Sequence, residues 1–212
     1  MAGDKVPETD SRGIPLKSVM PEKPAMWIIY TILHVVLGSI GLSIAWYFVY
    51  NPEANVKILI ILDLGLGWLY LGILVLKILQ IPLISILGHA RKDAKIGLPD
   101  QQVYKVMGAE GSKLGYILME TDGALGDFNR AQRALMNYHE NFPTTVLLYV
   151  AASFVFPFAS FVCISIWAIS RCINAFGYKG SVNGRLNAAL PEAIATSTLQ
   201  GILMIVAKKA LS

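Results

Sequence analysis

The chain has 212 residues, of which 55% are hydrophobic and 15% are charged, and its formal net charge is +4 at pH 7. With a mean hydropathy of +0.55, this composition excludes an ordinary soluble domain and indicates a polytopic membrane protein. The basic residues are spread over several loops without interleaved aromatic residues, so we expect no nucleic-acid partner.

Residues 1–25 form a polar tail that contains four prolines and charges of both signs. This composition is typical of a flexible or surface-draped segment. The apolar run that follows, residues 26–50, is about 25 residues long and predicts a first transmembrane helix, because that length spans a bilayer with some tilt. Aromatic residues at both of its ends are typical of membrane interfaces.

A second span is predicted over residues 56–87, which is longer than a membrane requires. The polar region that follows, up to Asp127, is about 40 residues long, and a loop of that length without structure is unusual. We therefore expect a short helix within it, with residues 99–107 as the best candidate.

The remaining apolar segments predict spans over residues 134–155, 158–176 and 186–207, which makes five spans in all. If the N-terminus is cytosolic, the opposite side of the membrane holds only three basic residues, Lys57, Lys208 and Lys209. The positive-inside rule therefore predicts a cytosolic N-terminus and a C-terminus on the other side.

A polar helix leads directly into the third span. Its residues Arg130, Arg133, Asn137 and Glu140 are spaced by 3, 4 and 3, so they fall within an arc of roughly 80° on one helix face. Ionisable groups at membrane depth cost roughly 2.5–3.5 kcal/mol each, so a cluster of them is by default a hypothesis of a functional site. The alternative is a cytosolic helix end with snorkelling side chains.

A second polar cluster lies at the cytosolic end of the fourth span. Arg171, Asn174 and Tyr178 are spaced by 3 and 4 and share a helix face, so the two clusters can meet. Cys163 and Cys172 lie in the same span, nine residues apart. We interpret both as small core residues and expect neither a disulfide nor a metal site.

Both clusters carry a family resemblance. Residues 130–143, with the pattern Arg-Ala-Gln-Arg-Ala-x-x-Asn-x-x-Glu-Asn-Phe-Pro, resemble the start of the second helix of the MAPEG family, the membrane-associated proteins in eicosanoid and glutathione metabolism. Residues 171–178, followed by Gly184 and Arg185, resemble the end of that family's third helix and the turn after it. The resemblance implies an all-α fold, with a four-helix membrane core over residues 56–212 and one extra transmembrane helix at 26–50.

The resemblance also implies an activity. Members similar to microsomal glutathione transferase activate the glutathione thiolate for attack on lipophilic electrophiles or lipid hydroperoxides. Arg185 stands where the family carries the arginine that does this, and a guanidinium beside the sulfur lowers the pKa of a thiol. A simple interface anchor is the alternative role for Arg185.

The remaining candidate residues match the chemical groups of glutathione, which has two carboxylates, an ammonium group and a thiol. Arginines supply planar bidentate cations for the carboxylates. Asn137 would hydrogen-bond the peptide, and Glu140 would bind the ammonium or support an arginine. The pattern Gly-x-x-Arg-Lys over residues 88–92 resembles the end of the family's first helix, where a basic residue helps bind glutathione, and Arg91 stands at that position. A positive stop for translocation explains Arg91 equally well. The full predicted binding set is Arg91, Arg130, Arg133, Asn137, Glu140, Arg171, Asn174 and Tyr178.

By resemblance, glutathione is the substrate or cosubstrate, the partners are membrane lipids and two further copies in a homotrimer, and the site lies between protomers. The endoplasmic reticulum is the implied location, with a mitochondrial or plastid membrane as the alternatives. Asn174 stands where several members of the family carry tyrosine or histidine. That replacement and the extra span support a second hypothesis, a non-catalytic subunit that keeps the fold within a larger membrane complex.

Overall fold

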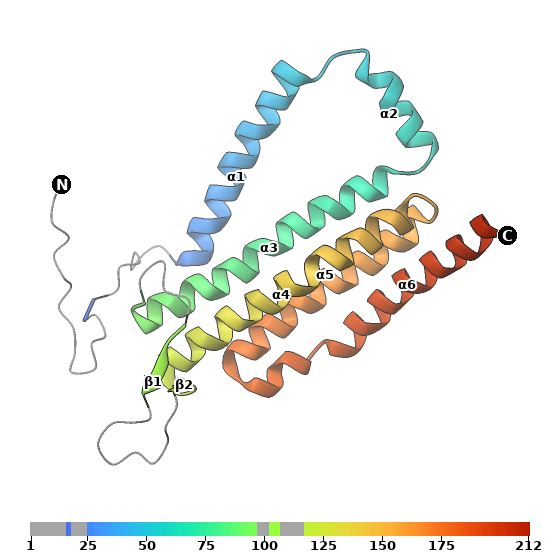
Figure 1. Cartoon of the computed structure of the whole chain (residues 1–212). Coiled ribbons are helices and arrows are strands. Elements are labelled where there is room, and N and C mark those ends of the chain that lie inside the picture. The colour runs from blue at the N-terminus through green and yellow to red at the C-terminus, as the bar shows by residue number, and fades with distance from the viewer. Residues whose placement is uncertain (1–15, 18–24, 97–101, 107–116) are drawn as a thin grey trace.

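The structure is a computed structural model and describes residues 16–17, 25–96, 102–106 and 117–212. Its core is a bundle of four long helices, α3 (Gly67–Ala94), α4 (Gly123–Ser153), α5 (Pro157–Gly180) and α6 (Ala189–Leu211). Successive helices of the bundle run in opposite directions (Figure 1). The prediction of an all-α membrane bundle with an extra N-terminal helix is confirmed.

Four helical segments in the described part of the chain are long and apolar enough to cross a membrane, namely residues 26–49, 67–94, 157–180 and 182–211. The second helix of the core, α4, carries the polar cluster in its first half and apolar residues from Val146 to Ala152 in its second. The polar helix and the predicted third span are thus one continuous helix. The chain is an integral membrane protein.

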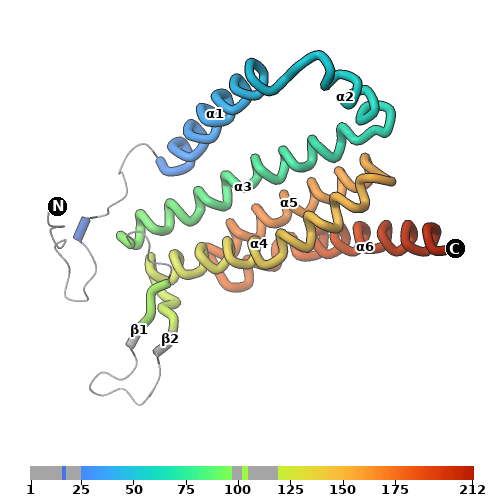
Figure 2. Tube along the Cα trace, turned by 45° about the horizontal axis from the view of Figure 1, so that its top comes forward, coloured from blue at the N-terminus to red at the C-terminus, as the bar shows by residue number. Residues whose placement is uncertain are grey.

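The extra N-terminal helix, α1 (Met26–Ile44), touches the bundle mainly at its first turns. Gly88 of α3 permits this contact, because a Cβ at that position would lie 2.8 Å from the ring of Tyr30. From there α1 diverges from α3 and continues as a short π-helix, Ala45–Val49 (Figures 1 and 2). A turn and the helix α2 (Ala54–Asp63) then lead back to the bundle.

The prediction of one continuous span over residues 56–87 is wrong. The helix breaks between Asp63 and Gly67, where Gly65 adopts a φ of +66° that side chains with a Cβ rarely tolerate. Apart from Asp63, the residues on either side of the break are mainly apolar, so hydrophobicity alone did not predict it. The apparent excess length of the span is explained by two helices in series.

The polar region before α4 contains a β-hairpin where we expected a helix. Strand β1 (Tyr104–Val106) pairs antiparallel with β2 (Ile117–Met119). The predicted helix over residues 99–107 is therefore wrong at 104–106, while 99–101 and 107 lie outside the described residues. The buried side chain of Asn129 in α4 explains the extended backbone. Its Oδ1 accepts from Val103 N at 2.8 Å and its Nδ2 donates to Val103 O at 2.7 Å, as a neighbouring strand would.

Tyr149 joins α4 to the start of α3. Its side chain is fully buried, and its hydroxyl donates to the carbonyl oxygens of Trp68 at 2.8 Å and Leu69 at 3.0 Å. Gly72 leaves room for it, since a Cβ there would lie 2.1 Å from the Tyr149 hydroxyl. The contact orients α4 and α3 relative to each other, and it lies at the opposite end of the bundle from the hairpin.

We expect Tyr149→Phe to lower the stability of the protein by about 1 kcal/mol, because the substitution removes one buried hydrogen-bond donor and leaves the ring in place. Thermal unfolding in detergent should show a melting temperature lower by about 2–4 °C. Tyr70→Phe in α3 is the matched control, because Tyr70 is 54% exposed. Equal melting temperatures for the two variants would contradict the structural role of the Tyr149 hydroxyl.

Candidate functional site

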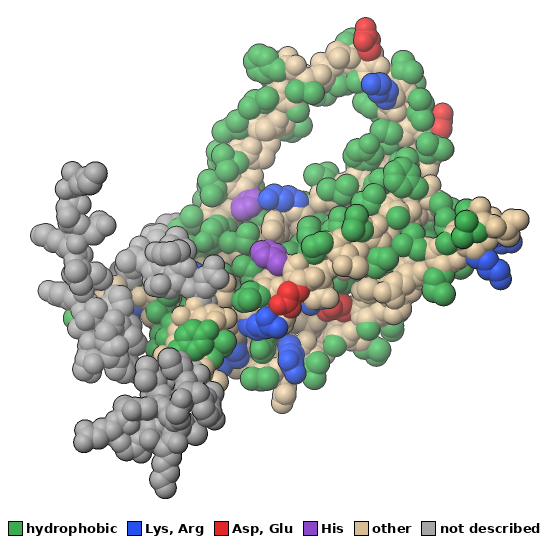
Figure 3. Space-filling model, in the orientation of Figure 1, with side chains coloured by type: hydrophobic (Ala, Val, Ile, Leu, Met, Phe, Trp, Pro, Cys, Tyr) green, Lys and Arg blue, Asp and Glu red, His purple; other side chains and the backbone are tan. Residues whose placement is uncertain are grey.

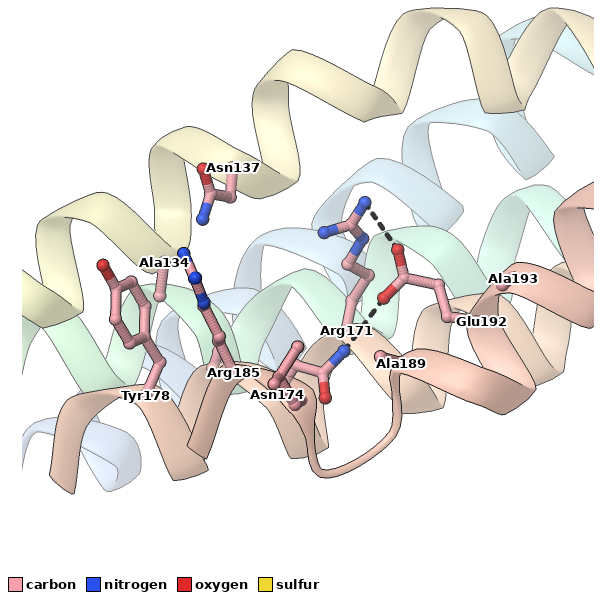
Figure 4. Close-up of a pocket in the computed structure, with 11 residues that line it drawn as sticks. Ala134, Asn137, Arg171, Asn174, Tyr178, Arg185, Ala189, Glu192 and Ala193 are labelled. Atoms are coloured by element: carbon pink, nitrogen blue, oxygen red, sulfur yellow. Dashed lines mark hydrogen bonds and ion pairs between the residues drawn. The ribbon is translucent and has the colours of Figure 1, made fainter. Parts of the chain in front are cut away.

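A cavity of about 230 Å³ lies between α4, α5, α6 and the short 3₁₀ turn Val182–Leu186 that joins the last two helices. It is at the end of the bundle where α5 ends and α4 and α6 begin. Figure 4 shows side chains from all four elements pointing into it. The lining residues are Ala134, Asn137, Arg171, Asn174, Ala175, Tyr178, Arg185, Leu186, Ala189, Glu192 and Ala193.

Two glycines bring the 3₁₀ turn against the end of α5. A Cβ on Gly177 would lie 2.4 Å from the carbonyl oxygen of Gly184, and a Cβ on Gly184 would lie 2.1 Å from that of Gly177. The hydroxyl of Ser181 caps the turn by accepting from Gly184 N at 3.1 Å. This close backbone approach folds the chain back over α5, so that the next residue, Arg185, reaches the cavity.

Arg171, Asn174 and Glu192 form a hydrogen-bonded network across one side of the cavity. Glu192 accepts from Arg171 Nη2 at 2.7 Å and from Asn174 Nδ2 at 2.9 Å. The other amide atom of Asn174, Oδ1, accepts from the backbone N of Ala188 at 2.7 Å. The network is largely withdrawn from solvent, with the side chains of Arg171 and Glu192 only 14% and 18% exposed. It fixes the start of α6 against α5.

Arg185 behaves differently from Arg171. Its guanidinium extends across the cavity toward Asn137 and beside Tyr178 (Figure 4). Within the described part of the chain, its side chain makes no hydrogen bond or ion pair. The cavity therefore contains two guanidinium groups and one carboxylate, and the carboxylate neutralises only Arg171. What remains is one uncompensated positive charge beside a half-buried amide and a phenol, an arrangement suited to an anion.

The structure brings five of the predicted site residues together in this cavity: Asn137, Arg171, Asn174, Tyr178 and Arg185. It leaves Arg130 outside. The Arg130 guanidinium donates to the carbonyl oxygens of Lys179 at 2.9 Å and Thr121 at 2.7 Å and pairs with Asp127. In one chain, Arg130 therefore ties the start of α4 to the end of α5.

The other three predicted residues also lie outside the cavity of the single chain. Arg133 and Glu140 pair with each other at 2.9 Å on the exposed surface of α4. Arg91 is 5% exposed, and its guanidinium lies 5.0 Å from the ring centre of Phe128. Arg91 thus packs between α3 and α4.

Sequence reasoning missed Glu192. The signal was present, because Glu192 is the only acidic residue between Arg185 and the C-terminus and directly follows Pro191, which is typical of a first helical turn. An acid that begins an otherwise apolar span requires a partner. Arg171 supplies it.

The described residues contain no group of three or more histidine, cysteine, aspartate or glutamate side chains that could hold a metal ion. Cys163 and Cys172 are both buried and free. The polar side chains that line the cavity can supply charge stabilisation and hydrogen bonding.

Comparison with known proteins supports the resemblance noted in the sequence. The model of the MAPEG family matches residues 67–205, which covers α3, α4, α5, most of α6 and every residue that lines the cavity. Helices α1 and α2 precede the matched region. No curated protein matches the chain.

Proposed function

Because the chain belongs to the MAPEG family of membrane proteins in eicosanoid and glutathione metabolism, we propose that it is a glutathione transferase or peroxidase that acts on lipophilic substrates from the bilayer. The observation that carries the proposal is the unpaired Arg185 guanidinium in a cavity with Asn137 and Tyr178. An arginine with no carboxylate partner is free to stabilise an anion brought by a ligand. The anion in question is the thiolate of glutathione.

In this proposal Arg185 holds the thiolate, Asn137 and Tyr178 hydrogen-bond the peptide, and Asn174 positions the start of α6. Arg171 belongs to the proposed set as a cation in the cavity wall, where its Nη2 pairs with Glu192. Arg130, Arg133, Glu140 and Arg91 belong to the proposed set through their motif positions. In a homotrimer, the exposed pair Arg133 and Glu140 would reach the cavity of a neighbouring protomer.

The proposed reaction begins when the glutathione thiol gives its proton to water and the sulfur remains as a thiolate against Arg185. The sulfur then attacks an electrophilic carbon, a C–S bond forms, and the leaving group departs with the bonding electron pair. With a lipid hydroperoxide, the sulfur attacks the terminal oxygen, the O–O bond breaks, and the lipid alcohol leaves after it takes up a proton. A second glutathione converts the resulting sulfenic acid to glutathione disulfide and water.

Titration of the purified protein with glutathione, followed by the ultraviolet absorbance of the thiolate, tests the proposal. We expect a signal that saturates at one thiolate per occupied site. S-methylglutathione, which has no thiol, should give no signal and should displace glutathione. A folded protein that binds neither ligand would refute the proposal.

A second candidate function, that of a non-catalytic subunit in a larger membrane complex, is favoured by two observations. Several polar groups of the cavity already have partners within the chain, because Arg171, Asn174 and Glu192 bond one another and the backbone of Ala188. In addition, helix α1 exposes most of its length. The oligomeric state of the isolated protein distinguishes the two functions, because the enzyme proposal predicts a homotrimer and the subunit proposal predicts one copy within a complex.

A further inference from the structure

A groove separates the extra helix α1 from the bundle. Two cavities of about 470 and 490 Å³ lie along it and adjoin at Ile81, which lines both of them. Each falls within the range of about 300–1,000 Å³ that is typical of sites for small molecules. Figure 3 shows the opening between α1 and the bundle, with mainly hydrophobic side chains around it.

The groove is closed at one end by the contact of Met26 and Tyr30 with Gly88. Beyond this contact the walls come from α1 and α3, and Phe176 and Lys179 of α5 complete the first cavity. The second cavity continues between the same two helices and is mainly apolar, with His34 and Lys77 at its sides. The space widens beyond the contact with Gly88, because α1 diverges from α3 (Figure 1).

Polar groups gather near the closed end. The Ser85 side chain is buried, with the residue 5% exposed, and among the described residues its hydroxyl has no hydrogen-bond partner. His89 Nδ1 lies 2.9 Å from the carbonyl oxygen of Ser85. Because a carbonyl can only accept, Nδ1 carries the proton and Nε2 stays available. Lys179 also lines this cavity, and its ammonium lies 3.8 Å from the exposed carboxylate of Asp93.

We infer that this groove is a binding site for an anionic phospholipid of the surrounding leaflet, with the head-group phosphate at Ser85, His89 and Lys179 and one acyl chain along Ile81 toward His34. An unpartnered buried hydroxyl beside a cation is what a phosphate oxygen would satisfy. Basic pockets between transmembrane helices on the cytosolic side are typical sites for anionic lipid head groups. The positive-inside distribution places this end of the bundle on that side.

The groove is separate from the glutathione cavity. Helix α5 presents Phe176 and Lys179 to the groove, whereas Arg171, Asn174 and Tyr178 line the cavity on its other side. Helix α1 also lies outside the residues that the family model matches. The lipid site therefore does not depend on the proposed enzyme function. A bound lipid would fill the space between α1 and α3 and hold the extra helix to the bundle.

Native mass spectrometry of the full-length protein, after removal of detergent and addition of defined lipids, tests the inference. We expect phosphatidylglycerol to be retained at one molecule per chain, at least about fivefold more than phosphatidylcholine, because only the former carries net charge. The double variant His89→Gln/Lys179→Gln should lose this preference. Ile81→Trp, which narrows the groove without touching the polar end, should reduce retention of both lipids.

Lys209→Ala is the matched control, because it removes a cation from the exposed end of α6, far from the groove. It should retain phosphatidylglycerol as the unmodified protein does. Equal retention of the two lipids, or retention that neither variant changes, would overturn the inference. Preferential retention of oleate over phosphatidylglycerol would also overturn it, since the occupant would then be a fatty acid.

Discussion

Replacement of Arg185 by alanine should abolish the thiolate signal of bound glutathione and lower turnover on the order of 10²–10³-fold, the usual effect of removing one group that stabilises charge in a transition state. The dissociation constant of glutathione should rise by less than about tenfold, or about 1.4 kcal/mol, because the remaining contacts of the peptide persist. The important result is a large loss of turnover together with a small change in the dissociation constant of glutathione. It would show that Arg185 acts on the sulfur rather than on the whole ligand.

Two further variants complete this experiment. Arg185→Lys keeps the charge but loses the planar guanidinium, so part of the thiolate signal should return. Lys208→Ala removes a cation from the exposed end of α6 and should behave as the unmodified protein does. If Arg185→Ala leaves both thiolate and turnover unchanged, Arg185 has no part in the chemical step and the subunit function becomes the better account.

Helix periodicity was sufficient to predict the cluster on α5. Arg171, Asn174 and Tyr178 share a face by spacing alone, and the structure places all three in one cavity. The same rule was not sufficient for α4. There Arg130 lies on the predicted face, but the carbonyl oxygens that it contacts belong to Thr121 and Lys179. Spacing within a helix carries no information about acceptors supplied by other segments.

The hairpin and the role of Glu192 depend on tertiary contacts, whereas the break in the second predicted span depends on the backbone conformation of Gly65. The break at Gly65 interrupts a mainly apolar run, and hydropathy carries no information about the backbone dihedral angle of a residue. The hairpin strand β1 replaces an expected helix because the side chain of Asn129 bonds the backbone of Val103. The role of Glu192 likewise depends on Arg171, a residue on another helix.

The pair formed by Arg171 and Glu192 should dominate the stability of the site. Arg171→Met leaves a mostly buried carboxylate, and Glu192→Leu leaves a mostly buried guanidinium, so each single substitution should cost about 3 kcal/mol. The double variant has no unpaired charge and should lose less stability than either single variant. Unfolding of all four proteins in the same detergent gives the coupling energy between the two side chains.

The exposed pair of Arg133 and Glu140 is the control for the coupling energy between Arg171 and Glu192. Its two side chains are 42% and 52% exposed, so the solvent screens the attraction, and the same cycle of substitutions should give a coupling energy of less than about 1 kcal/mol. Coupling energies below about 1 kcal/mol for both pairs would show that water reaches Arg171 and Glu192 freely. In that case Glu192 would not neutralise Arg171 within the cavity, and Arg171 would be as available to a ligand carboxylate as Arg185 is to the thiolate.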